Sequence, residues 1–129
     1  MSEIEIRPRV LVVGDEHLRG AMSLLLPLRG YEVIADTDGA ELPLTLKRLA
    51  AESIRFSAAI VGGNIPPFYS EQGRIDVVEA IRGAEGFDGV IVGSSADDIP
   101  GTDVTEFTTR RLINSLAEKV HPDIDQMAA

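Results

Sequence analysis

The segment Arg9–His17 places the strongest constraint on what this chain can fold into. Its run Val10-Leu11-Val12-Val13 carries no charge and is rich in β-branched residues, and Gly14 and Asp15 follow at once. A short apolar run of this kind predicts a β-strand buried on both faces, as in a parallel sheet. Functional residues of open α/β sheets gather where such strands end. The search for a site therefore starts at Gly14 and Asp15.

Strand patterns and helix patterns alternate along the chain. Apolar runs predict strands at about 9–13, 31–35, 56–61, 89–93 and 104–107, and apolar residues at helical spacing predict helices at about 18–26, 40–53, 73–83 and 109–120. Strands alternating with helices form right-handed crossovers and a parallel sheet covered on both faces. We therefore expect a flavodoxin-like α/β fold, a three-layer sandwich with strand order 2-1-3-4-5 and a crevice between strands 1 and 3.

The composition limits the class of protein. The chain has 129 residues, 44% of them hydrophobic, which is enough for one buried core, and it has no cysteine, two histidines and a net charge of −9. The lack of cysteine excludes disulfides and thiolate zinc sites, and an acidic chain without a basic cluster is unsuited to nucleic acid. No apolar run reaches the roughly 18 residues of a membrane span, and the N-terminus lacks the pattern of a signal peptide. We expect a cytoplasmic protein with a single domain over residues 1–129, whose core lies at about 8–120 and whose tail, 121–129, is frayed.

Several motifs resemble the first half of response-regulator receiver domains, the CheY-like family. They are Val10–Glu16, Gly30–Val33 and Asp38–Leu42, in the order and spacing of that family. The resemblance continues at Ile60–Pro66 and Val90–Ser94 and covers about residues 8–95. It implies a receiver-like domain with a role in signal transduction, as in two-component systems.

The residues that receivers use for phosphorylation are largely missing. Receivers have an acidic pair after strand 1 that holds Mg²⁺, a phosphate-accepting aspartate after strand 3, a Ser or Thr after strand 4 and a Lys after strand 5. The resemblance places Gly14 and Asp15 at the acidic pair, Gly62 at the phosphoacceptor and Ser94 at the hydroxyl, and it finds no matching lysine. Glycine has no nucleophile, so no aspartyl phosphate can form at Gly62. The chain thus looks like a pseudo-receiver, an atypical response regulator that is not an enzyme and acts on a protein partner without being phosphorylated.

The last third of the chain departs from the family pattern. About 14 residues separate Ser94 from Thr109, too few for the helix and strand that receivers have there, and Pro100-Gly101 would break a helix. We expect the fourth helix to be shortened or missing, with residues 104–107 as a short fifth strand. A competing interpretation makes Thr105–Val120 the fourth helix and leaves four strands.

Near the predicted crevice there are two groups of candidate residues, and each group has two interpretations. Asp15, together with Glu16, either holds Mg²⁺ weakly through water or caps the following helix. Gly62, Gly63 and Asn64 either admit a small ligand or nucleotide close to the backbone, which would make the domain a ligand sensor, or form only a tight turn.

The remaining candidates concern partners and catalysis. Phe68 and Tyr69, in a proline-flanked loop, either anchor a protein partner or fold over the edge of the sheet. His17 and Ser94 are predicted to lie at the same edge of the sheet, as in a hydrolase site, but Gly93-Ser94-Ser95 lacks the nucleophile pattern of a hydrolase. The sequence predicts no required cofactor, and it leaves the partner and the oligomeric state open.

Overall fold

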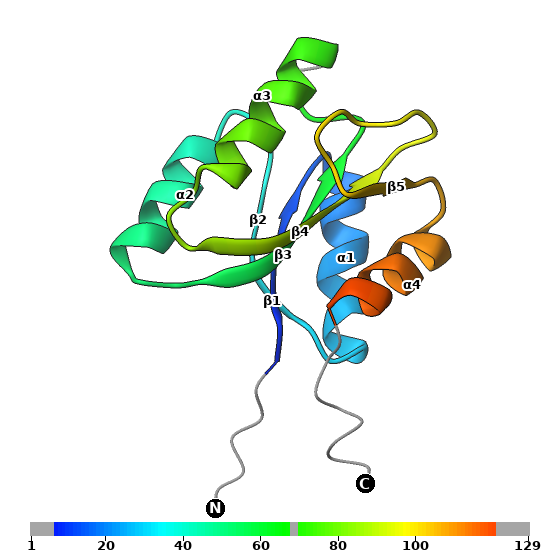
Figure 1. Ribbon diagram of the computed structural model, residues 1–129, viewed down its shortest axis with the longest axis horizontal. Helices are drawn as coiled ribbons and strands as arrows, with labels where there is room; N and C mark the ends of the chain where they lie inside the picture. The colour runs from blue at the N-terminus through cyan, green and yellow to red at the C-terminus, as the bar shows by residue number, and fades with distance from the viewer. Residues whose placement is uncertain (1–6, 68–69, 121–129) are drawn as a thin grey trace, which may run out of the picture.

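The computed structural model describes residues 7–67 and 70–120, in which strands and helices follow one another along the chain (Figure 1). The elements are β1 (Arg9–Val13), α1 (Glu16–Leu28), β2 (Glu32–Thr37), α2 (Leu42–Ala51), β3 (Phe56–Gly62), α3 (Glu71–Arg82), β4 (Phe87–Ser94), β5 (Val104–Glu106) and α4 (Thr109–Lys119). No helix within these residues has the length and apolar character needed to cross a bilayer.

The five strands form one sheet in the order β2-β1-β3-β4-β5, and every neighbouring pair is parallel. Parallel neighbours need connections that cross the sheet, so helices cover its faces. α1 and α4 pack on one face, and α2 and α3 pack on the other (Figure 1). The predicted strand order and the three-layer flavodoxin-like sandwich are confirmed.

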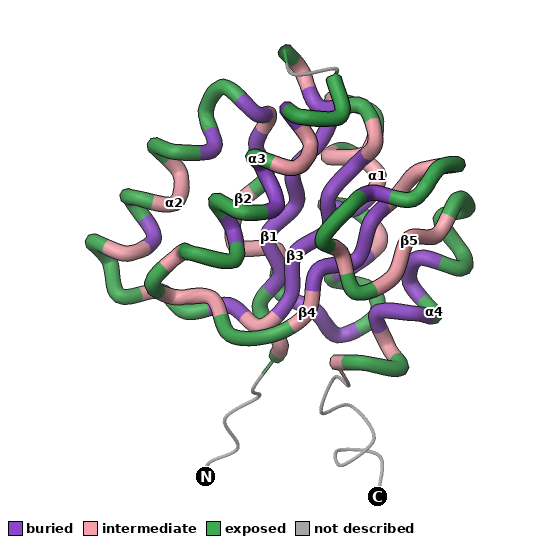
Figure 2. Tube along the Cα trace, turned by 45° about the horizontal axis from the view of Figure 1, so that its top comes forward, coloured by how far each residue is buried: buried purple, intermediate pink, exposed green. Residues whose placement is uncertain are grey.

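The central strands are buried along most of their length (Figure 2). Their alternate side chains enter two separate cores, one on each face of the sheet. Leu11 and Val13 pack with α2 and α3, whereas Val10 and Val12 pack with α1 and α4. None of these four side chains exposes any surface. A strand that buries both faces needs an apolar residue at every position, which explains the uncharged run in β1.

The helix ends follow from local chemistry. The side chains of Asp15, Ser70 and Thr108 each accept a hydrogen bond from the backbone N–H three residues later and cap α1, α3 and α4. Pro27 lies in the last turn of α1, close to the predicted end of that helix. Gly30 follows with a φ of 91°, a conformation that glycine adopts without strain.

Between β4 and β5, where the sequence predicted a shortened or missing fourth helix, the described residues form no helix. The described residues contain four helices, and the fourth, α4, is an 11-residue helix that follows β5. Residues 95–103 form turns and bends, since Pro100 and Gly101, with its φ of 87°, do not fit a helix. The competing four-stranded interpretation is wrong, because β5 pairs in parallel with Val92–Ser94.

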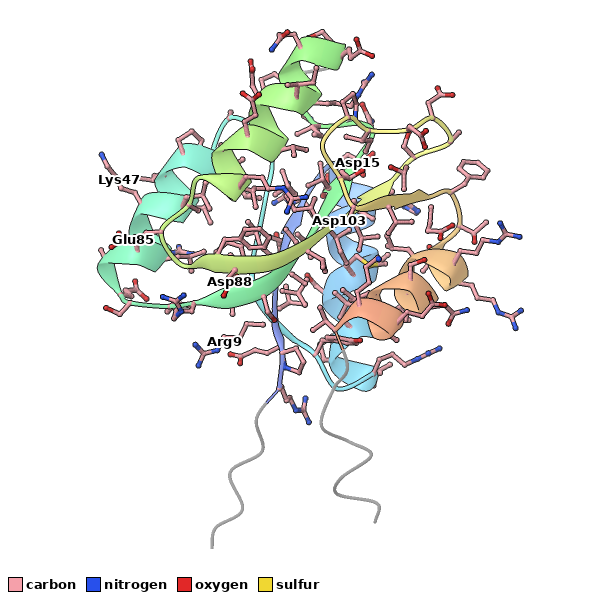
Figure 3. The ribbon with its side chains drawn as sticks, in the orientation of Figure 1. Arg9, Asp15, Lys47, Glu85, Asp88 and Asp103 are labelled. Carbon is pink, nitrogen blue, oxygen red and sulfur yellow. The ribbon has the colours of Figure 1, made fainter. Side chains whose placement is uncertain are left out.

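Asp103 ties this connection to the rest of the domain (Figure 3). Its Oδ2 accepts hydrogen bonds from the Ile91 backbone N–H at 2.8 Å and from Arg82 at 3.0 Å, and Arg82 also donates to the Gly101 carbonyl at 2.9 Å. Burial by itself raises the pKa of Asp103, but these hydrogen bonds and the positive charge of Arg82 outweigh it and lower the pKa below its ordinary value. Ile99 of the same connection is buried in the core beneath α2 and α3.

Candidate functional site

The predicted site residues meet at one end of the sheet. Gly62, the last residue of β3, is in register with Ser94, the last residue of β4. Asp15 follows β1 at this end, and Arg9 and Asp88 mark the opposite end (Figure 3). This is the edge formed by the carboxyl ends of the strands, where the sites of such sheets form.

A groove of about 310 Å³ lies along this edge. Its lining includes the predicted residues Asp15, His17, Gly62, Gly63, Asn64 and Ser94, and also Leu18, Ala21 and Phe107, which the sequence did not assign to the site. Phe107 is 72% exposed. The fold therefore brings the predicted residues together, but it places apolar side chains among them.

Leu18 occupies the space in front of both strand-end glycines. A Cβ atom built on Gly14 would lie 2.7 Å from Leu18 Cδ2, and one built on Gly62 would lie 2.9 Å from the same methyl group. Carbon atoms pack at about 3.5–4.0 Å, so any side chain at either position has to displace Leu18. The sequence predicted a helix that begins at about Leu18 but did not assign this side chain to the site. In the sequence, the signal that an apolar side chain fills this space is that two neighbouring strands both end in glycine, at Gly14 and Gly62.

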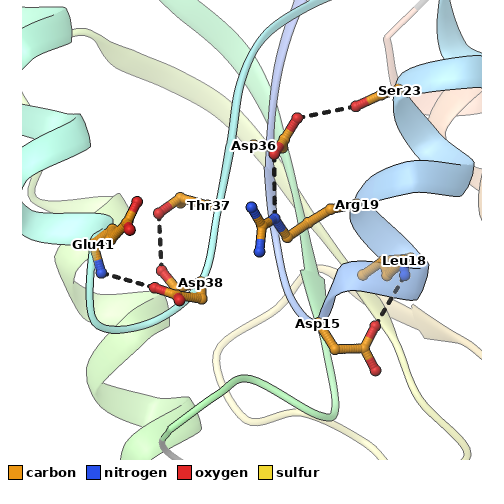
Figure 4. A network of polar contacts seen from close by, with 8 residues as sticks. All are labelled: Asp15, Leu18, Arg19, Ser23, Asp36, Thr37, Asp38 and Glu41. Atoms are coloured by element: carbon orange, nitrogen blue, oxygen red, sulfur yellow. Dashed lines mark hydrogen bonds and ion pairs between the residues drawn. The ribbon is translucent and has the colours of Figure 1, made fainter.

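Asp15 has a structural role that engages both of its carboxylate oxygens. Oδ1 accepts a hydrogen bond from the Leu18 backbone N–H at 2.9 Å, which caps α1 (Figure 4). Oδ2 accepts a hydrogen bond from Asn64 Nδ2 at 3.1 Å. Asp15 thus links the start of α1 to the turn that follows β3, in agreement with the capping interpretation.

The turn after β3 approaches the end of β4 closely. The Gly63 N–H donates to the Ser94 carbonyl at 2.9 Å, and Arg74 donates to the Gly63 carbonyl at 3.3 Å. A Cβ atom built on Gly63 would lie 2.5 Å from Ser95 Oγ. Glycine is required here because β4 and its following residues occupy the adjacent space, which favours the tight-turn interpretation.

The end of β5 supplies no positive charge to the groove. Glu106 is in register with Ser94, but its Oε2 accepts a hydrogen bond from Ser115 Oγ of α4 at 2.5 Å. Thr105 instead shares a hydrogen bond with Thr102 at 3.0 Å and accepts one from the Ile99 N–H at 3.2 Å. Both side chains are held by neighbouring elements.

Acidic residues at the end of β2 and just after it also have structural partners (Figure 4). Asp36 accepts hydrogen bonds from Arg19 at 3.2 Å and from Ser23 at 3.1 Å, which ties β2 to α1. Asp38 Oδ1 accepts from the Glu41 N–H at 2.8 Å, just before α2. These carboxylates order the turns around the sheet.

The Mg²⁺ ion that receivers bind does not fit the residues at this edge. Gly14 and Gly62 stand at two of the three positions that the resemblance assigns to carboxylates, Leu18 fills the space in front of them, and the oxygens of Asp15 accept hydrogen bonds from Leu18 and Asn64. Within residues 7–67 and 70–120, no group of three Asp, Glu or His side chains is placed to hold a metal ion. Phe68 and Tyr69, the predicted partner anchors, lie outside the described residues.

Comparison with known proteins relates the chain to others through its structure. No protein-family model and no curated protein matches it. A response regulator receiver protein from Burkholderia phymatum superimposes with a TM-score of 0.61 at 22% identity, covering 87% of this chain and 94% of that one. A CheY-like receiver domain protein from Methanospirillum hungatei JF-1 gives 0.60 at 17% identity, covering 96% and 100%. The signal receiver domain of an HD domain-containing protein from Pseudomonas fluorescens Pf-5 gives 0.59 at 13% identity, also covering 96% and 100%. The chain therefore has the fold of receiver domains.

Proposed function

We propose that this protein is a pseudo-receiver that acts in signal transduction through contacts with a protein partner, independently of phosphorylation. The observation that carries the proposal is the packing of one leucine side chain, Leu18, against the positions of two missing carboxylates, Gly14 and Gly62. The receiver fold supports a signalling role, and this packing supports a role without phosphate.

Phosphoryl transfer to a receiver needs a nucleophile and positive charge to balance the transferred group. Gly62 supplies no nucleophile. Of the positions that the resemblance assigns to carboxylates, Asp15 alone keeps an acid, and its two oxygens already accept hydrogen bonds from Leu18 and Asn64. Phosphate donors therefore have neither an acceptor nor a binding site here, and the domain holds one state in their presence.

The same edge supports a role in protein binding. Leu18, Ala21 and Phe107 line the groove, and Phe107 is exposed although aromatic side chains are usually buried. Exposed aromatic residues beside a groove are common anchors of protein interfaces. We propose the groove as the partner-binding surface, with Phe68 and Tyr69, which lie outside the described residues, as additional anchors predicted from the sequence.

A titration with Mg²⁺ and then beryllofluoride, followed by amide NMR, tests the absence of phosphorylation. The wild-type chain should show no saturable shifts around Asp15, Gly62 and Ser94, and incubation with acetyl phosphate should add no mass. Saturable shifts at these residues, or a mass gain of one phosphoryl group, would refute the proposal.

Two variants separate the lost carboxylate from the blocked space. Leu18→Ala opens the space without adding an acid, so it should remain silent in the same titration. Leu18→Ala combined with Gly62→Asp adds a carboxylate beside Asp15, so Mg²⁺-dependent shifts should appear. A response of Leu18→Ala alone would mean that a working cation site survives under the leucine.

A second candidate function is sensing of a small ligand or nucleotide at this edge. The groove volume of about 310 Å³ favours it, since ligand pockets begin at about 300 Å³. A thermal-shift screen of metabolites and nucleotides tests it, because a ligand present well above its Kd raises the melting temperature. Stabilisation by a nucleotide that is lost in Asn64→Ala would favour the sensor over the protein-binding module.

A further inference from the structure

The first turn of α4 carries two adjacent arginines, Arg110 and Arg111, and both are exposed. Among the described residues, neither guanidinium group forms an ion pair or a hydrogen bond, whereas three other arginines each pair with a carboxylate. Thr108 already caps the helix through the Arg111 backbone N–H, and the first turn holds no acidic residue. Cations at a helix N-terminus oppose the helix dipole. The two side chains therefore do not stabilise the helix that carries them.

These two arginines stand beside the groove at the carboxyl ends of the strands. Phe107 and Thr109, which precede them in the chain, line that groove, and Phe107 is 72% exposed. In a helix the Cα–Cβ bonds tilt towards the N-terminus, so side chains of the first turn extend towards the end of α4 that borders the groove. α4 lies beside α1, whose Leu18 also lines the groove (Figure 1). The α4 side of the groove thus combines an exposed aromatic ring with two positive charges.

A second basic pair, on α2, provides the contrast. Lys47 and Arg48 are exposed as well, but Arg48 stands in the last turn of its helix, where a cation favours the helix dipole. Neither residue lines the groove, and α2 packs on the opposite face of the sheet from α4. The pair on α2 has a structural explanation that the pair on α4 lacks. Residues that break such a local rule are expected at functional sites.

We propose that the groove binds an acidic segment of a partner protein, whose carboxylates pair with Arg110 and Arg111 while an apolar side chain of the same segment packs against Phe107. This inference rests on the proposed function and adds the chemistry of the partner to it. Guanidinium groups bind carboxylates through two parallel hydrogen bonds, so the arginines supply geometry as well as charge. The groove volume of about 310 Å³ suits a few side chains of a short segment.

The charge of the whole chain favours an acidic partner at this place. With a net charge of −9, the chain attracts basic molecules to much of its surface and gives them no preference for the groove. An acidic segment is repelled by that overall charge and attracted where Arg110 and Arg111 stand, so electrostatics fixes its position and orientation. A nucleic acid, which is bound by neutralising many phosphates, needs a larger basic surface than this pair.

Selection of a random peptide library displayed on phage, with the full chain as the target, tests the chemistry of the partner. The enriched peptides should carry a net negative charge and an aromatic or aliphatic residue. The most enriched sequence is then synthesised with a fluorophore, and its Kd for each variant is measured by fluorescence anisotropy at about 0.15 M salt. Arg110→Glu combined with Arg111→Glu should weaken binding at least about tenfold, because it turns attraction into repulsion. Acids in the first turn favour a helix, so this variant keeps α4.

Lys47→Glu combined with Arg48→Glu is the matched control. It changes the net charge by the same amount on the opposite face of the sheet, and charges more than about 8 Å away are screened at this ionic strength. It should leave the Kd unchanged within about twofold. Arg110→Lys combined with Arg111→Lys keeps the charge and should lose less affinity than the charge reversal. Equal losses in the two charge-reversed variants would overturn the proposal, since only the overall charge of the chain would then matter.

Phe107→Ala separates a failure of this inference from a failure of the proposed function. If the enriched peptides are neutral or basic but lose affinity for Phe107→Ala, the groove binds partners and the acidic segment is refuted. Acidic peptides that bind the Arg110→Glu and Arg111→Glu double variant as well as the wild-type chain would refute it too. If no enriched peptide depends on Phe107, both the groove as partner-binding surface and this inference fail.

Discussion

Replacing Gly62 with alanine tests whether Leu18 and the strand-end glycines form one packed unit. The new Cβ atom would lie 2.9 Å from Leu18 Cδ2, well inside normal carbon contact, so Leu18 must turn away or the strand must shift. Overpacking of this kind costs about 1–3 kcal/mol. Alanine also restricts the unfolded chain, which returns about 0.4–1 kcal/mol where the backbone conformation permits it. The difference of the two terms gives a net loss of unfolding free energy of about 0–2.6 kcal/mol in the wild-type background.

Removal of Leu18 should reverse the sign of this effect. In a Leu18→Ala background the methyl group is gone, so Gly62→Ala should stabilise the domain by about 0.4–1 kcal/mol. The double-mutant cycle then gives a coupling free energy of about 1–3 kcal/mol, the range of residues in direct contact. Urea unfolding, followed by the circular dichroism signal of the helices, measures the unfolding free energy of the wild-type chain, the two single variants and the double variant. The assay needs no tryptophan.

Gly83→Ala is the control for this cycle. Gly83 caps α3 on the opposite face of the sheet, and a Cβ atom there would meet Glu79 O at an ordinary 3.5 Å. Its effect should add to that of Leu18→Ala within about 0.5 kcal/mol. If Gly62→Ala is equally additive, Leu18 does not fill the space of the missing carboxylate and the packing argument for the proposed function fails.

Three further predictions concern stability. Tyr31→Phe should cost about 1 kcal/mol because it removes the hydrogen bond that the Tyr31 hydroxyl donates to the Val120 carbonyl at 2.7 Å. Burial raises the pKa of Tyr31 to about 12 from an ordinary 10.0, so the stability that the neutral hydroxyl contributes is complete below pH 10 and is lost as the pH rises towards 12. Urea unfolding across this window should show a fall in the unfolding free energy of the wild-type chain that Tyr31→Phe lacks. An equal fall in both chains would contradict the assignment. The contacts that lower the pKa of Asp103 stabilise the fold above pH 3.8, the ordinary pKa of the group, and this stabilisation is lost as the pH falls below that value. Asp103→Asn should therefore lose less unfolding free energy in acid than the wild-type chain. Parallel acid-unfolding curves of the two chains would contradict the Arg82 contact. Asp15→Ala should cost about 1 kcal/mol as the loss of a helix cap, whereas Asp15→Asn should cost much less, and a similar loss in both by urea unfolding would show that charge and not capping matters.

Much of the fold is predictable because its signals are local in the sequence. The uncharged run in β1 specifies a strand buried on both faces, and the alternation of strand and helix patterns specifies a parallel sheet. The break at Pro100-Gly101 marks the irregular connection after β4, although it does not reveal that Asp103 and Arg82 hold that connection in place. Side chains from separate elements meet there, and no periodic pattern records such a meeting.

The candidate site is likewise predictable from the sequence only in part. The order of the motifs predicts that Gly14, Gly62 and Ser94 lie at the site. The residue type at position 62 predicts the lack of a nucleophile, because glycine has no side chain that could react. That Leu18 fills the gap, that Asn64 binds Asp15 and that Phe107 stands exposed beside them depends on how α1, β3 and α4 dock on the sheet. Likewise, the sequence shows that α1 is apolar on its inward side, but only the packed structure decides that Leu24 and Leu28 remain uncovered. Local sequence determines which residues can form each element, whereas the contacts between elements depend on the packing of the whole chain.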